Sequence, residues 1–401
     1  MRVAVLLVLA IAAPAVAKPD RPKPIPQPEL AGRPRPRTGA RQVIVIAPTT
    51  PFRKQRALDD REREQLERRA RTETGLDRIA ALDALTAALE QLEPPDTELD
   101  LLMGEISMLY ARVLFEPGLE AYPYADELVL RAAKSVASAD EKVAVRALER
   151  MLVKFPSSPF LSEAHLTLAG IAESKRDYAT AKRHLEAILS NPRGPLASYA
   201  RLKLGWLFHT AKDYPKAVAQ LARVITESND RLIVEAAADS IIAPYAFAGR
   251  AGFAAILFDH VGRGSAAERL RNLAAEYGEL GKRAEEAVVL RAAIVREGDL
   301  DAICRDRADI VAAMTSAHNS IDAEVAIAEL AEAVRFADAS CAAAADDAVG
   351  TLALEWHRAG LAPAQLMRAW DHAAALATTA ERREIAELNR DALAKSQRAA
   401  R

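Results

Sequence analysis

The amino-acid sequence predicts an all-α protein of repeated helix pairs, and three observations carry that prediction. From Pro51 almost to the end, apolar residues recur at helical spacing and no alternating strand pattern appears. Half of the residues are hydrophobic but only 5% are aromatic, and Ala and Leu, which favour helices, supply most of the apolar surface. One stretch of sequence also repeats itself at a step of 36 residues.

The charge balance argues against a nucleic-acid partner. The chain has 54 basic and 56 acidic residues among its 401, which gives a formal net charge of −2. A chain with so little net charge has no overall field that attracts a phosphate backbone.

Residues 1–17 have the composition of a signal peptide. Arg2 precedes an apolar run from Val3 to Ala13, and small residues stand at the −3 and −1 positions of a cut after Ala17. The run is shorter than the roughly 20 residues that a membrane-spanning helix needs. We therefore expect export to the periplasm, cleavage after Ala17 and no transmembrane segment after cleavage. The alternatives are an uncleaved anchor and a chance apolar start.

Residues 18–51 differ in composition from the rest of the chain. They hold nine of the 21 prolines and an excess of Lys and Arg over Asp and Glu. Alternating prolines block helices and favour an extended backbone, so we expect a disordered, basic linker. Within it, Val43–Ile46 is the one strongly β-like run, which either packs on the chain's own helices or adds as a strand to a partner's sheet.

The rest of the chain is expected to be helical throughout. Arg53–Arg71 is charged on every face, which predicts a solvated helical arm. Apolar residues then follow at helical spacing from Ile79 to Leu92, and Asp140 and Ser265 are predicted as helix N-caps. The predicted segments are the charged arm at 52–75, the helix pairs at 76–378, with the clearest repeats at 160–295, and a C-terminal helix or tail at 379–401.

The repeat is clearest between residues 164–189 and 200–225. Small residues at matching positions let the two helices of a pair approach each other, a Tyr fills the gap at the turn, and a Leu closes the contact with the next pair. The matching positions are Leu168-Ala169 and Leu204-Gly205, Asp177-Tyr178 and Asp213-Tyr214, Ala181 and Ala217, and Leu185 and Leu221.

This pattern resembles the tetratricopeptide repeat (TPR) family, whose helix pairs carry a Leu-Gly, a Tyr near the turn and an Ala in the second helix. A weaker copy begins at Leu273-Ala274, and Phe247–Phe258 resembles a divergent pair. The resemblance implies a right-handed α-solenoid. The phrases Phe155-Pro156, Lys203-Leu204-Gly205-Trp206 and Leu354-Glu355-Trp356-His357 are similar to periplasmic TPR proteins of gliding bacteria and, more distantly, to outer-membrane-assembly TPR lipoproteins. No cysteine near Ala17 matches the lipid-attachment site of those lipoproteins.

The resemblance also implies a binding groove, because the first helix of each TPR pair lines the concave face. Trp206 with its neighbours on one helical stripe has the composition of an interface anchor. The alternative is that Trp206 packs between neighbouring pairs. The predicted groove residues are Glu163, Leu166, Glu173, Tyr199, Leu202, Trp206 and His209.

The two cysteines, Cys304 and Cys341, lie 37 residues apart, close to one repeat length. In an oxidising compartment this spacing predicts a disulfide, and the alternative is two buried free thiols.

No catalytic or cofactor motif stands out. The seven histidines form no HExxH pattern, and no Walker, GxSxG or GxGxxG element is present, so we expect no metal, no cofactor and no enzyme activity. The predicted function is a non-catalytic periplasmic scaffold that binds other envelope proteins through the concave groove and the Pro-rich tail. The resemblance to periplasmic TPR proteins implies a role in motility or envelope assembly. The alternatives are a cell-wall-associated helical enzyme or its accessory subunit, and a cytoplasmic TPR adaptor.

Overall fold

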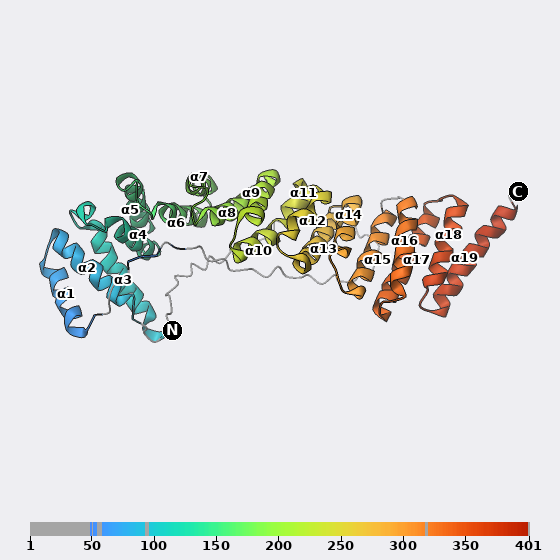
Figure 1. Cartoon of the computed structure of the whole chain (residues 1–401), viewed down its shortest axis with the longest axis horizontal. Coiled ribbons are helices and arrows are strands. Elements are labelled where there is room, and N and C mark those ends of the chain that lie inside the picture. Colours follow the sequence, from blue (N-terminus) through green and yellow to red (C-terminus); the bar gives the residue numbers. More distant parts are fainter. Residues whose placement is uncertain (1–48, 50, 54–57, 93–95, 317–319, 400–401) are drawn as a thin grey trace, which may run out of the picture. The chain divides into compact units, whose positions relative to one another are not determined.

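The computed structural model describes residues 49, 51–53, 58–92, 96–316 and 320–399. In these residues every regular element is a helix, which confirms the all-α prediction (Figure 1). The predicted signal peptide, most of the predicted linker and the β-like run Val43–Ile46 lie outside the described residues. The chain divides into two compact units, unit 1 up to Ala200 and unit 2 from Arg201 onward.

Unit 1 is a series of helices in which each packs against the next along the chain. Its core is made of Leu, Ile, Val and Ala side chains, with Tyr110 and Met151 among the largest that are fully buried. Its elements are α1 (Asp60–Thr72), α2 (Gly75–Leu89), α3 (Asp96–Phe115), the 3₁₀ turn η1 (Leu119–Ala121), α4 (Ala125–Val136), α5 (Glu141–Lys154), α6 (Leu161–Ser174) and α7 (Tyr178–Ile188).

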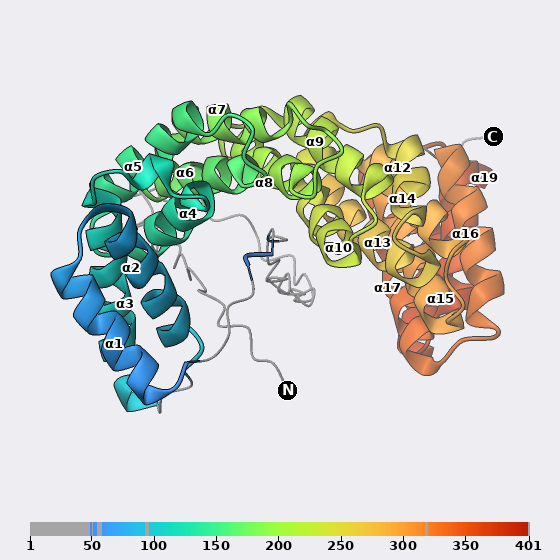
Figure 2. The same cartoon turned by 60° about the vertical axis from the view of Figure 1, so that its left-hand side comes forward.

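The predicted charged arm contains α1, which packs against α2 (Figure 2). Ala70 is buried and Leu66 is partly buried against the core of unit 1. The outward face carries ion pairs one turn apart, among them Arg63–Glu67 and Arg69–Glu73. α1 is therefore an amphipathic helix with one face packed on unit 1, and it is not solvated on every face.

Unit 2 is also entirely helical in its described residues, and the division between the units falls within α8 (Ala197–Thr210). The region of the divergent Phe247–Phe258 pair covers the end of one short helix and most of the next, α11 and α12. The elements after α8 are α9 (Tyr214–Glu227), α10 (Arg231–Ser240), α11 (Ile242–Ala248), α12 (Ala251–Asp259), α13 (Arg263–Glu279), α14 (Arg283–Ile294), α15 (Leu300–Ser316), α16 (Ser320–Val334), α17 (Ala339–Arg358), α18 (Pro363–Leu376) and α19 (Ala380–Ala399).

Small residues hold the repeated pairs together as the sequence predicts. Ala169, Ala181 and Ala217 are buried at the helix contacts. At Gly205 the approach is so close that an added Cβ would lie 2.5 Å from Cγ of Leu221. The repeat pattern therefore records a steric limit on how large these residues can be.

The two predicted N-caps have different outcomes. The Asp140 carboxylate accepts a hydrogen bond of 3.1 Å from the backbone N–H of Val143, so it caps α5 as predicted. The prediction for Ser265 is wrong, because α13 already begins at Arg263 and Gly262 is its N-cap residue. Because the helix begins two residues before it, Ser265 lies inside the first turn of α13.

One turn geometry recurs at the end of four helices. Arg176, Lys212, Gly281 and Gly360 have left-handed backbones, with φ of 60°, 60°, 71° and 67°. The residue that follows each donates its N–H to the carbonyl five positions earlier, as in a Schellman cap. These bonds join Asp177 to Ala172 (2.9 Å), Asp213 to Phe208 (2.8 Å), Lys282 to Tyr277 (2.8 Å) and Leu361 to Trp356 (3.3 Å).

A disulfide joins Cys304 on α15 to Cys341 on α17, with the two Cα atoms 5.9 Å apart. Both cysteines are fully buried. The bond links two helices that also pack against each other directly, so it lies within the core of unit 2.

Lys212→Gly is expected to stabilise the fold, because a non-glycine residue in the left-handed region costs about 1 kcal/mol. The matched change is Gly281→Ala at the equivalent turn position. Its Cβ meets nothing within 4 Å, so backbone strain is the expected source of any loss. Urea unfolding followed by circular dichroism should show a higher midpoint for Lys212→Gly and a lower one for Gly281→Ala. Shifts of the same sign would contradict this account of the turn.

Candidate protein-binding surfaces

The structure places the seven predicted groove residues at different depths. Leu202 is fully buried, and Glu163 is 2% exposed and forms an ion pair with Lys134. Neither side chain is open to solvent, because the period of a helix identifies a stripe but not how deeply neighbours cover each position. The residues that remain half-buried or exposed are Leu166, Glu173, Tyr199, Trp206 and His209.

Trp206 has the packing role that the sequence left as an alternative. Its indole N–H donates a 2.8 Å hydrogen bond to the hydroxyl of Ser240, and the Lys203 ammonium lies 5.4 Å from the centre of the ring system. The bond joins α8 to α10 inside unit 2. Truncating Trp206 would therefore disturb the packing of two helices as well as any surface.

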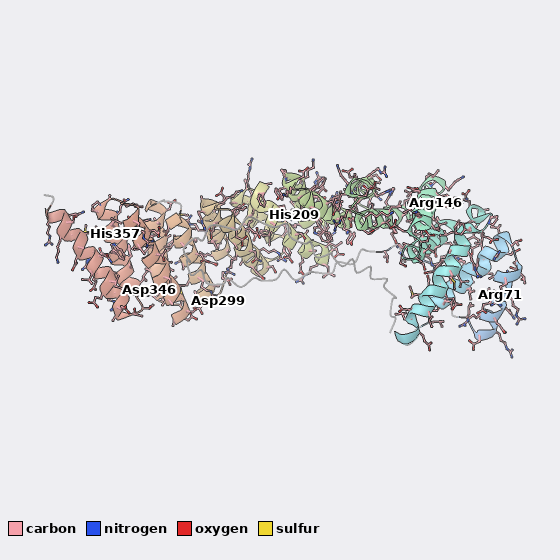
Figure 3. The ribbon with its side chains drawn as sticks, turned by 180° about the vertical axis from the view of Figure 1, so that it is seen from behind. Arg71, Arg146, His209, Asp299, Asp346 and His357 are labelled. Carbon is pink, nitrogen blue, oxygen red and sulfur yellow. A yellow bond between two sulfur atoms is a disulfide. The ribbon has the colours of Figure 1, made fainter. Side chains whose placement is uncertain are left out.

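Three aromatic side chains form a row: His209 near the end of α8, Tyr214 at the start of α9 and Phe247 on α11. The His209 and Tyr214 rings are 5.9 Å apart, and Tyr214 stacks on Phe247 at 4.3 Å with the planes 12° from parallel. His209, labelled in Figure 3, is exposed. Phe247 is 46% exposed. Three helices thus present a preassembled aromatic surface that is partly open to solvent.

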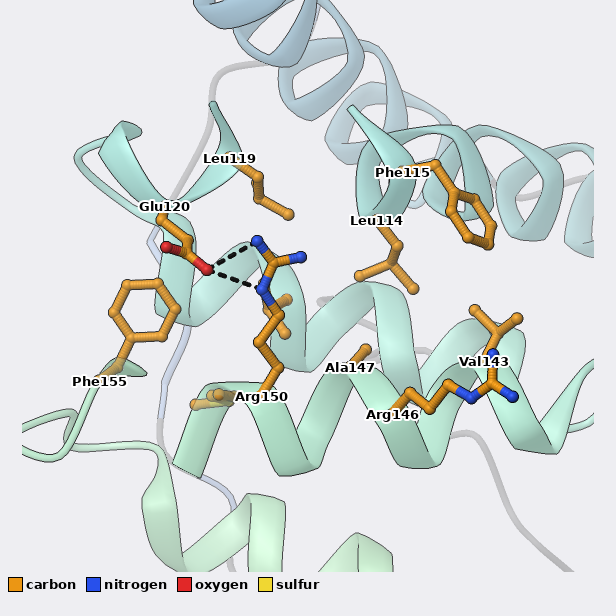
Figure 4. A pocket seen from close by; sticks show the side chains of 11 residues that line it. Leu114, Phe115, Leu119, Glu120, Val143, Arg146, Ala147, Arg150 and Phe155 are labelled. Carbon is orange, nitrogen blue, oxygen red and sulfur yellow. Dashed lines mark hydrogen bonds and ion pairs between the residues drawn. The ribbon is translucent and has the colours of Figure 1, made fainter. Parts of the chain in front are cut away.

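Unit 1 carries a small apolar pocket on α3, η1, α4 and α5, with a cavity volume of about 220 Å³. Two arginines of α5, Arg146 and Arg150, stand among its lining residues, and Arg150 bonds the Glu120 carboxylate at 2.7 Å (Figure 4). The volume is below the roughly 300–1,000 Å³ of ordinary small-molecule sites.

An ionic cluster lies in the interior of unit 1. Arg131 pairs with Asp83 at 3.3 Å and with Glu90 at 2.6 Å, and Tyr122 donates to Asp83 at 2.9 Å. Burial, followed by the charge of Asp83, raises the pKa of Tyr122 to about 12. The phenol therefore stays protonated and remains a donor at neutral pH.

The α6–α7 pair brings together two histidines that are 19 residues apart in sequence. The Nδ1 atoms of His165 and His184 are 3.1 Å apart, so one ring donates and the other accepts. Burial, followed by the charge of His184, lowers the pKa of His165 to about 4, and burial and then Arg183 lower that of His184. Both rings are therefore neutral at pH 7.

The sequence interpretation missed both the histidine pair and the ionic cluster. Matching residues across the two helices of a pair would have placed His165 opposite His184. Across the described ranges, no group of three or more His, Cys, Asp or Glu residues is arranged to hold a metal ion. None of the described helices is long and apolar enough to cross a bilayer.

These features define a repeat protein of stacked helix pairs with exposed faces suited to other proteins. Residues 124–244 match the family model described as tetratricopeptide repeat-like domain, in agreement with the resemblance seen in the sequence. TPR domains mediate protein–protein interactions.

Two solved structures match most of the chain at low sequence identity. The TPR domain of P58(IPK) is 12% identical, with 84% of this chain and 98% of that chain covered and a TM-score of 0.25. A computationally designed self-assembling cyclic homooligomer is 16% identical, with 84% and 99% covered and a TM-score of 0.10. Scores this low relate neither the helix arrangement nor the function of the proteins. No curated protein matches the sequence.

The histidine pair is expected to make unit 1 sensitive to acid. An ordinary His has a pKa near 6.5, and that of folded His165 is about 4, so the unfolded chain binds more protons between these values. The contribution of the neutral pair to the free energy of unfolding is fully present above pH 6.5 and is lost as the pH falls towards 4. Urea midpoints measured from pH 7 to pH 4 should fall less steeply for His165→Gln than for the parent protein.

Other groups titrate in the same range, so the comparison needs a matched histidine. His260 is exposed at the end of α12, and His260→Gln should keep the parent pH dependence. If His165→Gln follows the parent curve as well, the pair does not control acid sensitivity.

Proposed function

We propose that this protein is a non-catalytic adaptor that captures partner proteins on the aromatic row of unit 2. The observation that carries the proposal is the stack of Tyr214 on Phe247 beside exposed His209. TPR-like repeats in residues 124–244 support a scaffold role in general, and the row names a surface for it.

The chemistry of the row fits a protein partner. Aromatic side chains that are already packed lose little conformational entropy on binding, and they dominate the energetics of many interfaces. Ser240 holds the indole of Trp206, which lies three residues before His209 on α8. A partner therefore meets a surface that needs little rearrangement.

Phe247→Ala is expected to weaken partner capture by about 2 kcal/mol, which is roughly a 30-fold loss of affinity. Phe336, 70% exposed and also in unit 2, provides the matched control, Phe336→Ala. Crosslinking pull-downs with the tagged full chain should lose the same partners with Phe247→Ala that they keep with Phe336→Ala. Circular dichroism checks that both variants remain helical. Equal capture by both variants would contradict the proposal.

We further propose that the protein acts in the periplasm. Its partners there would belong to an envelope complex for motility or envelope assembly. Two features support it: the signal-like composition of residues 1–17 and the buried disulfide between Cys304 and Cys341. Disulfides form and persist in oxidising compartments and are rare in the cytosol.

If the protein is exported, its mature form should begin at a single, predictable residue. Cell fractionation should recover the chain in the periplasm, with Lys18 as its first residue after cleavage behind Ala17. Mass spectrometry without reduction should find Cys304 and Cys341 in one linked peptide pair. Recovery in the cytosol, with Met1 retained and both thiols open to alkylation, would overturn the export proposal and leave the aromatic-row proposal standing.

A further inference from the structure

The segment just before the first helix is seated against the interior of unit 1. The Phe52 ring is partly buried and its centre lies 5.6 Å from that of Phe160. The cationic groups of Arg131 and Lys134, both on α4, lie 5.8 Å and 5.6 Å from the centre of the Phe52 ring. Phe52 therefore has aromatic contact on one side and cation–π contact on another.

Arg53 reaches the ionic cluster directly. Its Nη2 atom is 2.6 Å from Oδ2 of Asp83, and its Nε atom is 3.4 Å from Oε2 of Glu127. Its backbone N–H lies 3.3 Å from each oxygen of the Glu127 carboxylate. The guanidinium also stacks over the Tyr124 ring at 3.6 Å. Arg53 thus forms ion pairs, a cation–π contact and backbone hydrogen bonds with unit 1.

The two arginine side chains contact different oxygens of the same carboxylates. Arg131 contacts Oδ1 of Asp83 at 3.3 Å and Oε1 of Glu127 at 3.8 Å, whereas the side chain of Arg53 contacts Oδ2 and Oε2. Asp83 and Glu127 are 2% and 4% exposed. A buried carboxylate is costly without a close cation, and the 3.8 Å contact to Arg131 is a weak substitute for Glu127. The site therefore calls for a second guanidinium.

We propose that Asp83, Tyr124, Glu127 and Phe160 form an arginine socket, a binding site for an extended peptide with a Phe-Arg pair. Its occupant in the structure is the chain's own Phe52–Arg53. The socket comes from α2, α4 and the entry to α6, whereas the occupant lies outside any helix and precedes α1. The proposal goes beyond the adaptor role and does not depend on it.

The occupant has the features of a detachable ligand. The described contacts come from two adjacent side chains and one backbone N–H, and the Arg53 side chain keeps 28% of its exposure. Arginine is suited to this role, because its planar fork pairs with two carboxylates while its face stacks on an aromatic ring. A peptide in solution with the same pair competes for the same socket.

Peptide binding to the full chain tests the socket. The probe is a fluorescein-labelled peptide with the sequence of residues 46–58, followed by anisotropy. The protein Phe52→Ala/Arg53→Ala leaves the socket empty and should bind the probe at least about tenfold more tightly than the parent protein, where the cis segment blocks the site. Adding Glu127→Gln to that variant should reverse most of the gain. A probe with both residues replaced by Ala should not bind.

Two results would overturn the proposal: equal probe binding by the parent and the double variant, and no binding by a double variant that keeps its helical circular dichroism. If the double variant unfolds, the single variant Arg53→Ala is titrated in its place, with the same expected gain. If both variants unfold, Phe52–Arg53 is part of the core and not a ligand, which also overturns the proposal. None of these results bears on capture through Phe247, so the two proposals fail separately.

Discussion

At Gly205 the backbone of α8 comes so close to α9 that a Cβ atom would lie 2.5 Å from Cγ of Leu221. This close approach within a helix pair is the constraint on which the rest of the structure depends. Buried alanines give the same contact elsewhere, and the left-handed turn after Arg176 or Lys212 returns the chain at the required angle.

The sequence pattern predicted the pairs whose contacts are local. The α6–α7 and α8–α9 pairs repeat their small residues and their Asp caps at one fixed step, so each pair is specified within about 26 residues. The three short helices α10–α12 have no such copy. Pro244 has no N–H to bond the carbonyl of Ser240, and the helix breaks between Ser240 and Ile242.

The functional surfaces were less predictable, because they depend on which faces the fold covers. Trp206, Leu202 and His209 share one predicted stripe, yet the structure makes them a packing residue, a core residue and a surface residue. The contact of Arg53 with Glu127 spans 74 residues, and no periodicity in one sequence records such a distance. Local pattern thus identifies the repeat, whereas the sites arise from tertiary contacts between elements.

The buried charges of unit 1 are not the most stabilising way to fill its interior. Burying Asp83 and Glu127 costs desolvation free energy, and well-packed apolar side chains of similar size would stabilise a core at least as well. What charges provide and apolar residues do not is discrimination, because only a guanidinium in the right place satisfies both carboxylates. Stability alone therefore does not account for this arrangement. The proposed arginine socket offers such an account, because it would select the segment that places Arg53 beside Phe52.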